Sequence, residues 1–357
     1  MGQTLSEPIT SKQSASVQNQ VVKVGSSSMQ GWRISMEDAH THILSLSEDK
    51  EAGFFAVYDG HGGAKVAAYV SKNLHKYIVR RPEYKEGKYE EAIKKGFLEC
   101  DEAMLKDESL RDEMSGCTAI TMLFRDGKLY VGNVGDSRCI ASTNGLAEPL
   151  STDHKPGDAK EKARIEKAGG FVEYNRVNGN LALSRALGDF AFKNNTELSP
   201  ENQVISCSPD VLVHEVTKDL QFVVLACDGI WDVLTNQDVA DFIIKRIASE
   251  LEPEIICEEL MNHCLATDSS IGGLGCDNMT VILICFLHNE PYQKLIDECK
   301  QIMEIREEKR TNELKESLRQ DDDEEEEEEE EEKDAEAAKS NDSAKKSTDE
   351  DADAGLK

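Results

Sequence analysis

The chain has 357 residues, of which 39% are hydrophobic, and its formal net charge is −29. This length suits one large domain or two small ones, and the apolar fraction is sufficient for a sizeable core. The acidic balance argues against a nucleic-acid-binding surface. No run approaches the roughly 18 apolar residues of a membrane-spanning helix, and no signal-peptide core precedes the first domain.

The first residues fit a lipidation pattern. Gly2 follows the methionine and Ser6 occupies the sixth position, as in N-myristoylation sites. A disordered start is the simpler alternative, and we expect residues 1–20, which are rich in Ser, Gln and Thr, to form a flexible arm. One acyl chain binds membranes only marginally and no dense basic patch follows, so membrane contact through Gly2 is expected to be weak and reversible.

Residues 21–290 alternate short apolar runs with segments of helical periodicity, and we expect them to form one domain. The predicted strands are Gly53–Tyr58, Cys117–Phe124, Lys128–Val134, Ser137–Ser142, Val211–Val216, Gln221–Ala226 and Met279–Phe286. The predicted helices are Ala64–Arg80, Tyr89–Leu105, Asp158–Ala168, Asn236–Ser249 and Pro253–Ala266. Tight turns such as Asp126-Gly127 favour antiparallel pairing, and paired helices favour outer layers. The expected fold is therefore α+β, a four-layer α-β-β-α sandwich of two antiparallel sheets flanked by helices.

The C-terminal region changes character after the domain. Residues 291–320 are charged and have a helical pattern. From Asp321 to Lys357 there are 19 acidic and 5 basic residues, a net charge of −14, which leaves −15 for the rest of the chain. A segment this acidic cannot bury enough apolar surface to fold, so we expect a disordered tail at 321–357. Such a tail is solvated, and attraction of basic partners or cations is the alternative.

Ten cysteines are present and none forms a C-x-x-C pair. Several lie inside apolar runs, as Cys227 does, which favours buried reduced thiols over a disulfide framework or a zinc site. Reduced thiols indicate a reducing compartment, so we expect a cytoplasmic or nuclear protein. Peripheral membrane association would require acylation of Gly2.

Carboxylates occur beside glycine or next to strands at four places in the chain. The Gly31–Asp38 segment ends in Glu37 and Asp38, and Asp277 precedes the last predicted strand. Asp59 and Asp228 each follow an apolar strand and precede a glycine. One Asp-Gly pair after a strand is usually only a turn, but four such clusters are harder to explain as turn chemistry. Converging carboxylates repel one another unless cations neutralise them.

Oxygen donors without Cys or His at ligand spacing favour Mg²⁺ or Mn²⁺ over zinc. Two such ions close together can ionise a water molecule and create a nucleophile near neutral pH. The sequence contains no G-x-x-x-x-G-K-[ST] loop, no G-x-S-x-G elbow and no C-x5-R loop. These absences favour direct hydrolysis without a covalent intermediate.

Two further side chains have suitable chemistry beside these carboxylates. His61 lies between glycines and titrates in the range that suits proton donation to a leaving alkoxide, whereas a loop histidine capping the next helix is the alternative. Arg33 offers a fork of donors that matches phosphate oxygens. Its alternative role is a salt bridge to Glu37 or Asp38.

Two other carboxylates are candidates for a third, weaker cation. Asp136 follows a predicted strand through a glycine, and Asp232 stands four residues after Asp228, on the same side of a helical turn if a helix starts there. A local pair with Arg138, or a helix cap, explains these two residues equally well.

The motifs taken together resemble the metal-dependent protein phosphatase family, the type 2C serine/threonine phosphatases. The matching segments are Gly31–Arg33 with Met36–His40, Tyr58–Gly63, Ser115–Ala119, Gly135–Arg138, Leu183–Asp189, Asp228–Asp232 and Asp277–Thr280. Their order and spacing agree over about residues 22–290, and the chain looks most like the animal and fungal alpha, beta and gamma subtypes.

The resemblance implies roles for individual residues. Asp59 would bridge two metals, and Glu37 with the Gly60 carbonyl would complete one site. Asp228 and Asp277 would hold the second metal, and Asp136 and Asp232 match a third-metal site. The resemblance also implies three roles outside the metal ligands: Asp38 would orient a metal-bound water, Arg33 would hold the phosphate and His61 would be the general acid. Residues between His154 and Asn180 would form a flap that shapes substrate access.

The resulting expectation is a protein serine/threonine phosphatase that acts as a monomer on phosphorylated proteins, protein kinases among them. A pseudophosphatase acting as a binding module would lack metal ligands, and here all of them are present. A nuclease would require a basic groove, which this acidic chain does not indicate.

Overall fold

The computed structural model describes residues 4–269 and 273–313. The chain divides into two compact units, Met1–Lys300 and Gln301–Lys357. The first unit contains the sheets, and its last residues, 292–300, are helical. In the second unit residues 301–313 are helical, while the end of the predicted extension and the acidic tail lie outside the described residues.

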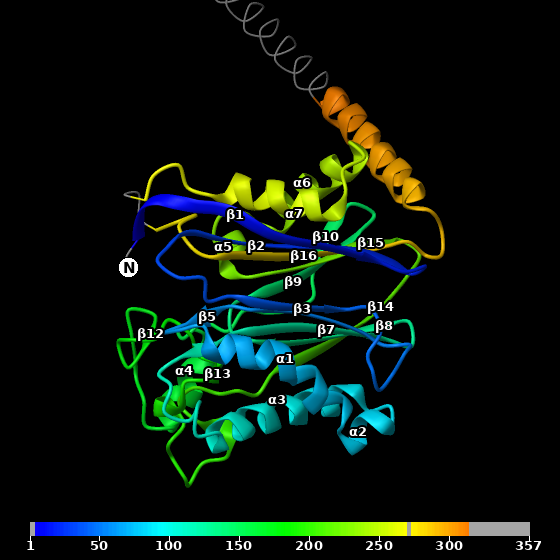
Figure 1. Cartoon of the computed structure of the whole chain (residues 1–357). Helices are drawn as coiled ribbons and strands as arrows, with labels where there is room; N and C mark the ends of the chain where they lie inside the picture. The colour runs from blue at the N-terminus through cyan, green and yellow to red at the C-terminus, as the bar shows by residue number, and fades with distance from the viewer. Residues whose placement is uncertain (1–3, 270–272, 314–357) are drawn as a thin grey trace, which may run out of the picture. The chain divides into compact units, whose positions relative to one another are not determined.

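Two antiparallel sheets form the centre of the first unit (Figure 1). In spatial order, the six-stranded sheet consists of β1 (Thr4–Gln18), β2 (Val22–Arg33), β16 (Met279–Phe286), β15 (Leu220–Ala226), β9 (Arg138–Thr143) and β10 (Leu146–Pro149). The five-stranded sheet consists of β14 (Asp210–Glu215), β8 (Lys128–Val134), β7 (Ala119–Arg125), β4 (Gly53–Tyr58) and β3 (Ala39–Ile43).

Helices cover the outer face of each sheet, which gives the four layers that the sequence predicts. In Figure 1 α6 and α7 lie above the six-stranded sheet, and α1 and α3 lie below the five-stranded one. The helices are α1 (Lys65–Val79), α2 (Pro82–Lys85), α3 (Tyr89–Lys106), α4 (Ala159–Lys167), α5 (Asp228–Trp231), α6 (Asn236–Ala248) and α7 (Pro253–Cys264), with 3₁₀ turns at Phe190–Phe192 and Pro200–Asn202.

Strand β4 shows why its sequence is a continuous apolar run. Its side chains alternate between two cores: Phe55 and Val57 pack between the two sheets, while Phe54, Ala56 and Tyr58 pack against the helical layer of α1 and α3. All five are buried. A strand with both faces covered loses the polar alternation of a surface strand, which is why its bounds were predictable.

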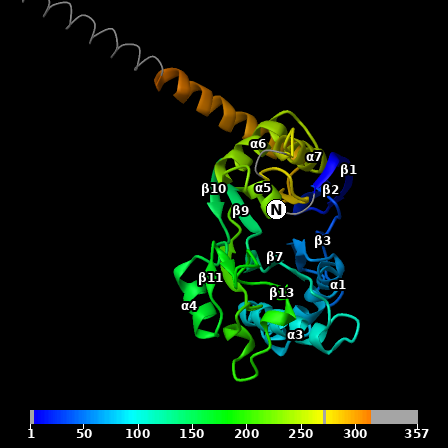
Figure 2. The same cartoon turned by 90° about the vertical axis from the view of Figure 1, so that its left-hand side faces the viewer.

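Shorter strands occupy one end of the sandwich, which faces the viewer in Figure 2. A three-stranded sheet contains β13 (Leu187–Gly188), β6 (Gly116–Cys117) and β5 (Gly60–His61), and a two-stranded one contains β11 (Val172–Glu173) and β12 (Arg176–Val177). Helix α4 and the β11–β12 hairpin share a small separate core around Ile165 and Val177. This part lies within the stretch expected to form a flap.

The expectation of a flexible arm over residues 1–20 is wrong for the residues described. Thr4–Gln18 forms β1, an edge strand paired antiparallel with β2 along most of its length. Its side chains are exposed or half-buried, so the segment has no apolar alternation that would indicate a strand. The backbone hydrogen bonds to β2 order it instead.

Strand β2 was also missed, because its centre is Gly25-Ser26-Ser27-Ser28 and yet is buried. Small side chains are needed here because α7 crosses close to the strand. A Cβ on Gly25 would collide with the backbone of Pro253 and Glu254 at the start of α7. This approach fixes α7 on the outer face of the sheet.

We therefore expect Gly25→Ala to destabilise the fold by about 3 kcal/mol, because a backbone contact cannot move aside as a side chain can. Urea unfolding measures the free energy. Gly87→Ala is the control, since nothing lies within 4 Å of the added carbon there, and it should cost about 1 kcal/mol for its left-handed backbone alone. Equal losses in the two variants would contradict the close approach of α7.

Candidate active site

The predicted carboxylates meet at one end of the sandwich because antiparallel neighbours start and finish there. Asp59 directly follows β4, and Asp228 begins α5 after β15. Asp277 stands two residues before β16, which pairs with both β15 and β2. Glu37 lies in the connection from β2 to β3. The chain reversal in each sheet thus brings together residues that are far apart in sequence.

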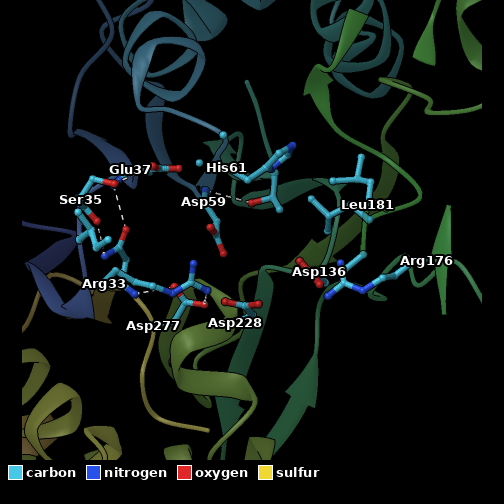
Figure 3. Close-up of a pocket in the computed structure, with 17 residues that line it drawn as sticks. Arg33, Ser35, Glu37, Asp59, His61, Asp136, Arg176, Leu181, Asp228 and Asp277 are labelled. Atoms are coloured by element: carbon cyan, nitrogen blue, oxygen red, sulfur yellow. Dashed lines mark hydrogen bonds and ion pairs between the residues drawn. The ribbon is translucent and has the colours of Figure 1, made fainter. Parts of the chain in front are cut away.

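A cavity of about 650 Å³ opens among these residues. Figure 3 shows Asp59, Asp228 and Asp277 between Arg33 on one side and Arg176 on the other. Of the ten predicted site residues, the cavity is lined by Arg33, Glu37, Asp59, Gly60, His61, Asp136, Asp228 and Asp277. The cavity lining does not include Asp38 and Asp232. Arg176, from the predicted flap region, and Leu181–Leu183, which directly follow that region, also line the cavity.

Burial and mutual repulsion shift the pKa values of the carboxylates around this cavity. Burial raises the pKa of Asp38 to about 7, with a further contribution from Asp277. Burial followed by repulsion from Asp228 and Asp38 raises the pKa of Asp59 well above its ordinary range. The pKa of Asp228 is also raised, first by burial and then by Asp136 and Asp277. Such a cluster is unfavourable when fully ionised unless positive charge is supplied.

Unpartnered oxygen atoms indicate where that charge fits. The Oδ1 atoms of Asp38 and Asp228 are buried without a hydrogen-bond partner. Burying such an atom costs free energy unless a ligand binds to it. Ligand atoms of Asp38, Asp59 and Cys227 lie within 4.8 Å of one another. A hard divalent cation fits the carboxylates of this set.

Cys227 has a different role from these carboxylates. Burial raises the pKa of its thiol, so the sulfur stays protonated. Its Sγ accepts a hydrogen bond from the Thr280 amide (3.2 Å) and donates to the Asn278 carbonyl (3.5 Å). It therefore joins the end of β15 to the start of β16. The start of β16 also holds Asp38, because the Asp38 Oδ2 atom accepts a hydrogen bond from the Thr280 hydroxyl at 2.7 Å.

Glu37 is held in place by backbone and side-chain donors. Its Oε2 accepts from the Gly63 amide at 3.0 Å and its Oε1 accepts from the Ser35 hydroxyl at 2.7 Å. Gly60 passes so close to the Glu37 carbonyl that a Cβ at this position would collide with it. The glycine after Asp59 is therefore required for the approach of the two predicted ligand segments.

Arg33 pairs with Asp277 rather than with Glu37 or Asp38, the alternative considered from sequence. Its Nη2 donates to Asp277 Oδ2, and its side chain remains 42% exposed. Arg33 lines the cavity, so the guanidinium has donors left for an anion while one carboxylate orients it. The Asp277 Oδ1 atom accepts from the Asn278 amide at 2.7 Å.

His61 has a partner that sequence reasoning did not assign. Its Nε2 lies 2.7 Å from Oδ2 of Asp189, a carboxylate that is 5% exposed. Asp189 has a left-handed backbone (φ 52°), and a Cβ on Gly116 would collide with its carboxylate. The Leu183–Asp189 motif indicated this segment, but the 128 residues that separate Asp189 from His61 gave no local signal of the pairing. His61 does not cap the next helix, since the N-cap position of α1 is Ala64.

Asn278 is a second residue whose role the sequence did not reveal. Its Oδ1 accepts from the Glu37 amide at 2.9 Å, and its Nδ2 donates to the Gln30 and Ser35 carbonyls at 2.8 and 3.0 Å. One amide side chain therefore holds the segment from Gln30 to Glu37, which includes Arg33, at three points.

We expect Asn278→Ala to lower the free energy of unfolding by about 3 kcal/mol, because it leaves three backbone groups without partners. Activity should fall roughly tenfold or more, since Arg33 and Glu37 lose their fixed positions. Urea unfolding and phosphate release measure the two effects. Asn262→Ala, which removes only an exposed bond to Lys12, should change neither. A stable Asn278→Ala enzyme with normal activity would contradict this role.

Asp136 and Asp232 lie near the same cluster; Asp232 is the C-cap residue of α5, as one alternative proposed, whereas Asp136 does not pair with Arg138. Asp136 Oδ2 accepts from Lys155 Nζ at 2.6 Å, not from Arg138. Arg138 instead forms a two-bond pair with Asp153 (3.0 and 2.9 Å). Burial raises the pKa of Asp232, with Asp136 among the contributing neighbours. Asp232 follows α5 directly, and its amide donates to the Asp228 carbonyl at 2.8 Å.

The ten cysteines, all among the described residues, are buried and none of them forms a disulfide, as the sequence predicts. Within the residues that the structure describes, no helix is long and apolar enough to span a membrane.

Comparisons with known proteins agree with this geometry. Residues 22–270 match the family model described as protein phosphatase 2C. A probable protein phosphatase 2C of Caenorhabditis elegans is 56% identical over 299 residues, which cover 84% of each chain. Protein phosphatase 2C homolog 3 of Schizosaccharomyces pombe is 52% identical over 304 residues, covering 83% of this chain and 73% of the relative. The crystal structure of a Toxoplasma gondii phosphatase superposes with a TM-score of 0.67 at 27% identity, covering 78% of this chain and 96% of that one.

Proposed function

This chain belongs to the protein phosphatase 2C family of metal-dependent serine/threonine phosphatases, and we propose that its cavity hydrolyses phosphoserine and phosphothreonine with two Mg²⁺ or Mn²⁺ ions. The observation that carries the proposal is the meeting of Glu37, Asp59, Asp228 and Asp277 around one cavity that Arg33 and His61 also line. When bound, the cations supply a water molecule ionised near neutral pH and neutralise phosphate charge.

The donor set suggests how the ions would be shared. Asp59 lies at the centre of the cluster, so it would contact both ions. Glu37 and the Gly60 carbonyl would complete one site, and Asp228 and Asp277 would complete the other. Asp38, with one oxygen held by Thr280 and the other unpartnered, would orient a water molecule.

The remaining roles belong to residues of this chain that do not hold ions. Arg33, oriented by Asp277, would bind the phosphate oxygens of the substrate. His61, held by Asp189, would donate the proton that the serine or threonine alkoxide needs as it leaves. The alkoxide of an aliphatic alcohol is a poor leaving group, so this proton should matter more for phosphoproteins than for aryl phosphates.

We expect the purified chain to release phosphate from a phosphothreonine peptide in the presence of Mn²⁺ or Mg²⁺, and EDTA to abolish the release. Restoring Mn²⁺ after EDTA should restore the rate, which separates loss of the ion from loss of the fold. Turnover that resists the chelator would contradict the metal-dependent reaction.

We also propose that phosphorylated proteins, protein kinases among them, are the substrates and that the chain acts as a cytoplasmic or nuclear monomer. The reduced, buried cysteines support an intracellular location. Acylation at Gly2 would add weak, reversible contact with a membrane surface. Mass spectrometry of the N-terminal peptide from cells tests the acylation, and sedimentation tests the monomer.

A further inference from the structure

Lys155 is a cation that the protein itself places on the rim of the acidic cluster. Its Nζ donates to Asp136 Oδ2 at 2.6 Å. The Asp136 side chain is 8% exposed and that of Lys155 is 36% exposed, so the pair lies at the boundary between the cluster and solvent. Burial alone would lower the pKa of Lys155, but Asp136, Asp153 and Asp232 outweigh it and raise the pKa above its ordinary value.

The residues just before Lys155 form hydrogen bonds with the residues just before Asp136. The Gly135 amide donates to His154 Nδ1 at 3.2 Å, and the His154 amide donates to the Gly135 carbonyl at 2.9 Å. Asn133 Nδ2 donates to the Thr152 carbonyl at 2.9 Å. The Lys155 amide donates to Asp158 Oδ2 at 3.1 Å. The position of the ammonium is therefore built into the backbone and is not an accident of a free side chain.

Among the described residues, Lys155 is the basic side chain that pairs with Asp136. Arg138, the nearest alternative along the chain, is committed to Asp153 and to Asn236 Oδ1 at 2.7 Å. Asp136 also repels Asp59, Asp228 and Asp232. Lys155 thus screens Asp136 from a cluster whose Asp228 Oδ1 has no hydrogen-bond partner.

We propose that Lys155 is a built-in counter-ion of the subsite formed by Asp136 and Asp232, and that a divalent cation binds this subsite only by displacing the ammonium. The inference rests on the metal-dependent function proposed above. Two positive charges cannot share Asp136 without repulsion, so the energy of the Lys155 pair is subtracted from the affinity for the ion. This competition makes the subsite weaker than the pair of sites around Asp59.

Lys155→Met tests the competition, because it keeps the length of the side chain and removes its charge. Manganese bound per chain is counted by electron paramagnetic resonance of free Mn²⁺ across a titration, with no substrate present. We expect the two tight ions to be unchanged and the weakest class of ion to bind roughly tenfold more tightly. Lys162→Met, on the exposed face of α4, is the matched control and should behave as the wild type. Adding Asp232→Asn to Lys155→Met should remove the gain.

Each outcome separates the inference from the proposed function. If wild type and Lys155→Met bind two tight ions and the weakest class is unchanged or weaker in the variant, the counter-ion is disproved while the two-metal centre stands. If the wild-type chain binds no tight ions, the proposed function itself fails.

A second measurement follows the wild-type protein and does not depend on the folding of Lys155→Met. Reductive ¹³C-methylation retains the charge of lysines, and Lys155→Arg identifies the Lys155 signal by its absence. During a Mg²⁺ titration of the wild type, we expect this signal to shift in the concentration range that fills the weak site, as the ammonium leaves Asp136. A Lys155 signal that stays fixed through that range would overturn the proposal.

Discussion

Asp59→Asn is expected to reduce the rate of phosphothreonine hydrolysis by roughly 1000-fold or more while leaving the fold intact. Asp59 is the carboxylate that Asp228, Asp38, Asp277 and Asp136 all act on, so it is the one best placed to hold two ions. Loss of this shared ligand removes several kcal/mol of stabilisation for the charge that develops in the reaction. Phosphate release at saturating Mn²⁺ measures the rate.

The same substitution has the opposite effect on stability without ions. Asparagine has nearly the shape of aspartate but removes one charge from a self-repelling cluster, so the ion-free variant should melt at or above the wild-type temperature. The Asp59 backbone amide donates to Thr118 Oγ1 (3.1 Å), and the substitution leaves this hydrogen bond in place. Asp112→Asn, at a side chain that is 85% exposed, should alter neither rate nor melting. An Asp59→Asn enzyme within tenfold of wild type would show that the bridging role is misassigned.

The site was predictable from sequence where chemistry and local structure coincide. Asp59 directly follows a strand and Asp228 stands two residues after one, and both faces of each strand are buried, so an apolar run ending in Asp-Gly marks a carboxylate at the edge of the core. Where the residues of a strand are small or polar, their pattern does not indicate a strand. β1 was missed because its order comes from backbone bonds to β2, and β2 was missed because the approach of α7 demands glycine and serine.

Partners across the fold were also beyond the sequence. The Asp189 carboxylate reaches His61 only because β13, β6 and β5 lie side by side. Lys155 reaches Asp136 only because the segment that carries it is bound back to Gly135. Local spacing favoured Arg138, two residues from Asp136, but the direction of that side chain commits it to Asp153. Contacts of this kind depend on how the strands and loops are arranged in space, and short sequence patterns do not indicate that arrangement.

Asp38→Asn should stabilise the ion-free protein by an amount that grows as the pH rises. Burial raises the pKa of Asp38 from 3.8 to about 7. The folded wild type therefore holds a proton that the unfolded chain has lost between these values, and its stability falls with rising pH across that window. Below pH 4 the residue is neutral in both states and contributes no difference. Above pH 7 the full cost, several kcal/mol in order of magnitude, is present.

The comparison between variant and wild type is needed because other groups oppose this trend. Burial lowers the pKa of His40 to about 4, and a depressed histidine pKa makes stability rise with pH up to its ordinary value near 6.5. Subtracting the two proteins cancels that contribution. Urea unfolding in EDTA at pH 5 and pH 8 should show a larger gap between Asp38→Asn and wild type at pH 8.

Manganese should shrink or reverse that gap, because a bound cation favours the ionised carboxylate and so lowers the cost that asparagine relieves. The repulsion between the carboxylates therefore lowers the stability of the ion-free protein and, at the same time, raises its affinity for cations. A gap that is independent of pH in EDTA, or that Mn²⁺ leaves unchanged, would mean that Asp38 does not share its charge with the cluster and that the carboxylates act separately.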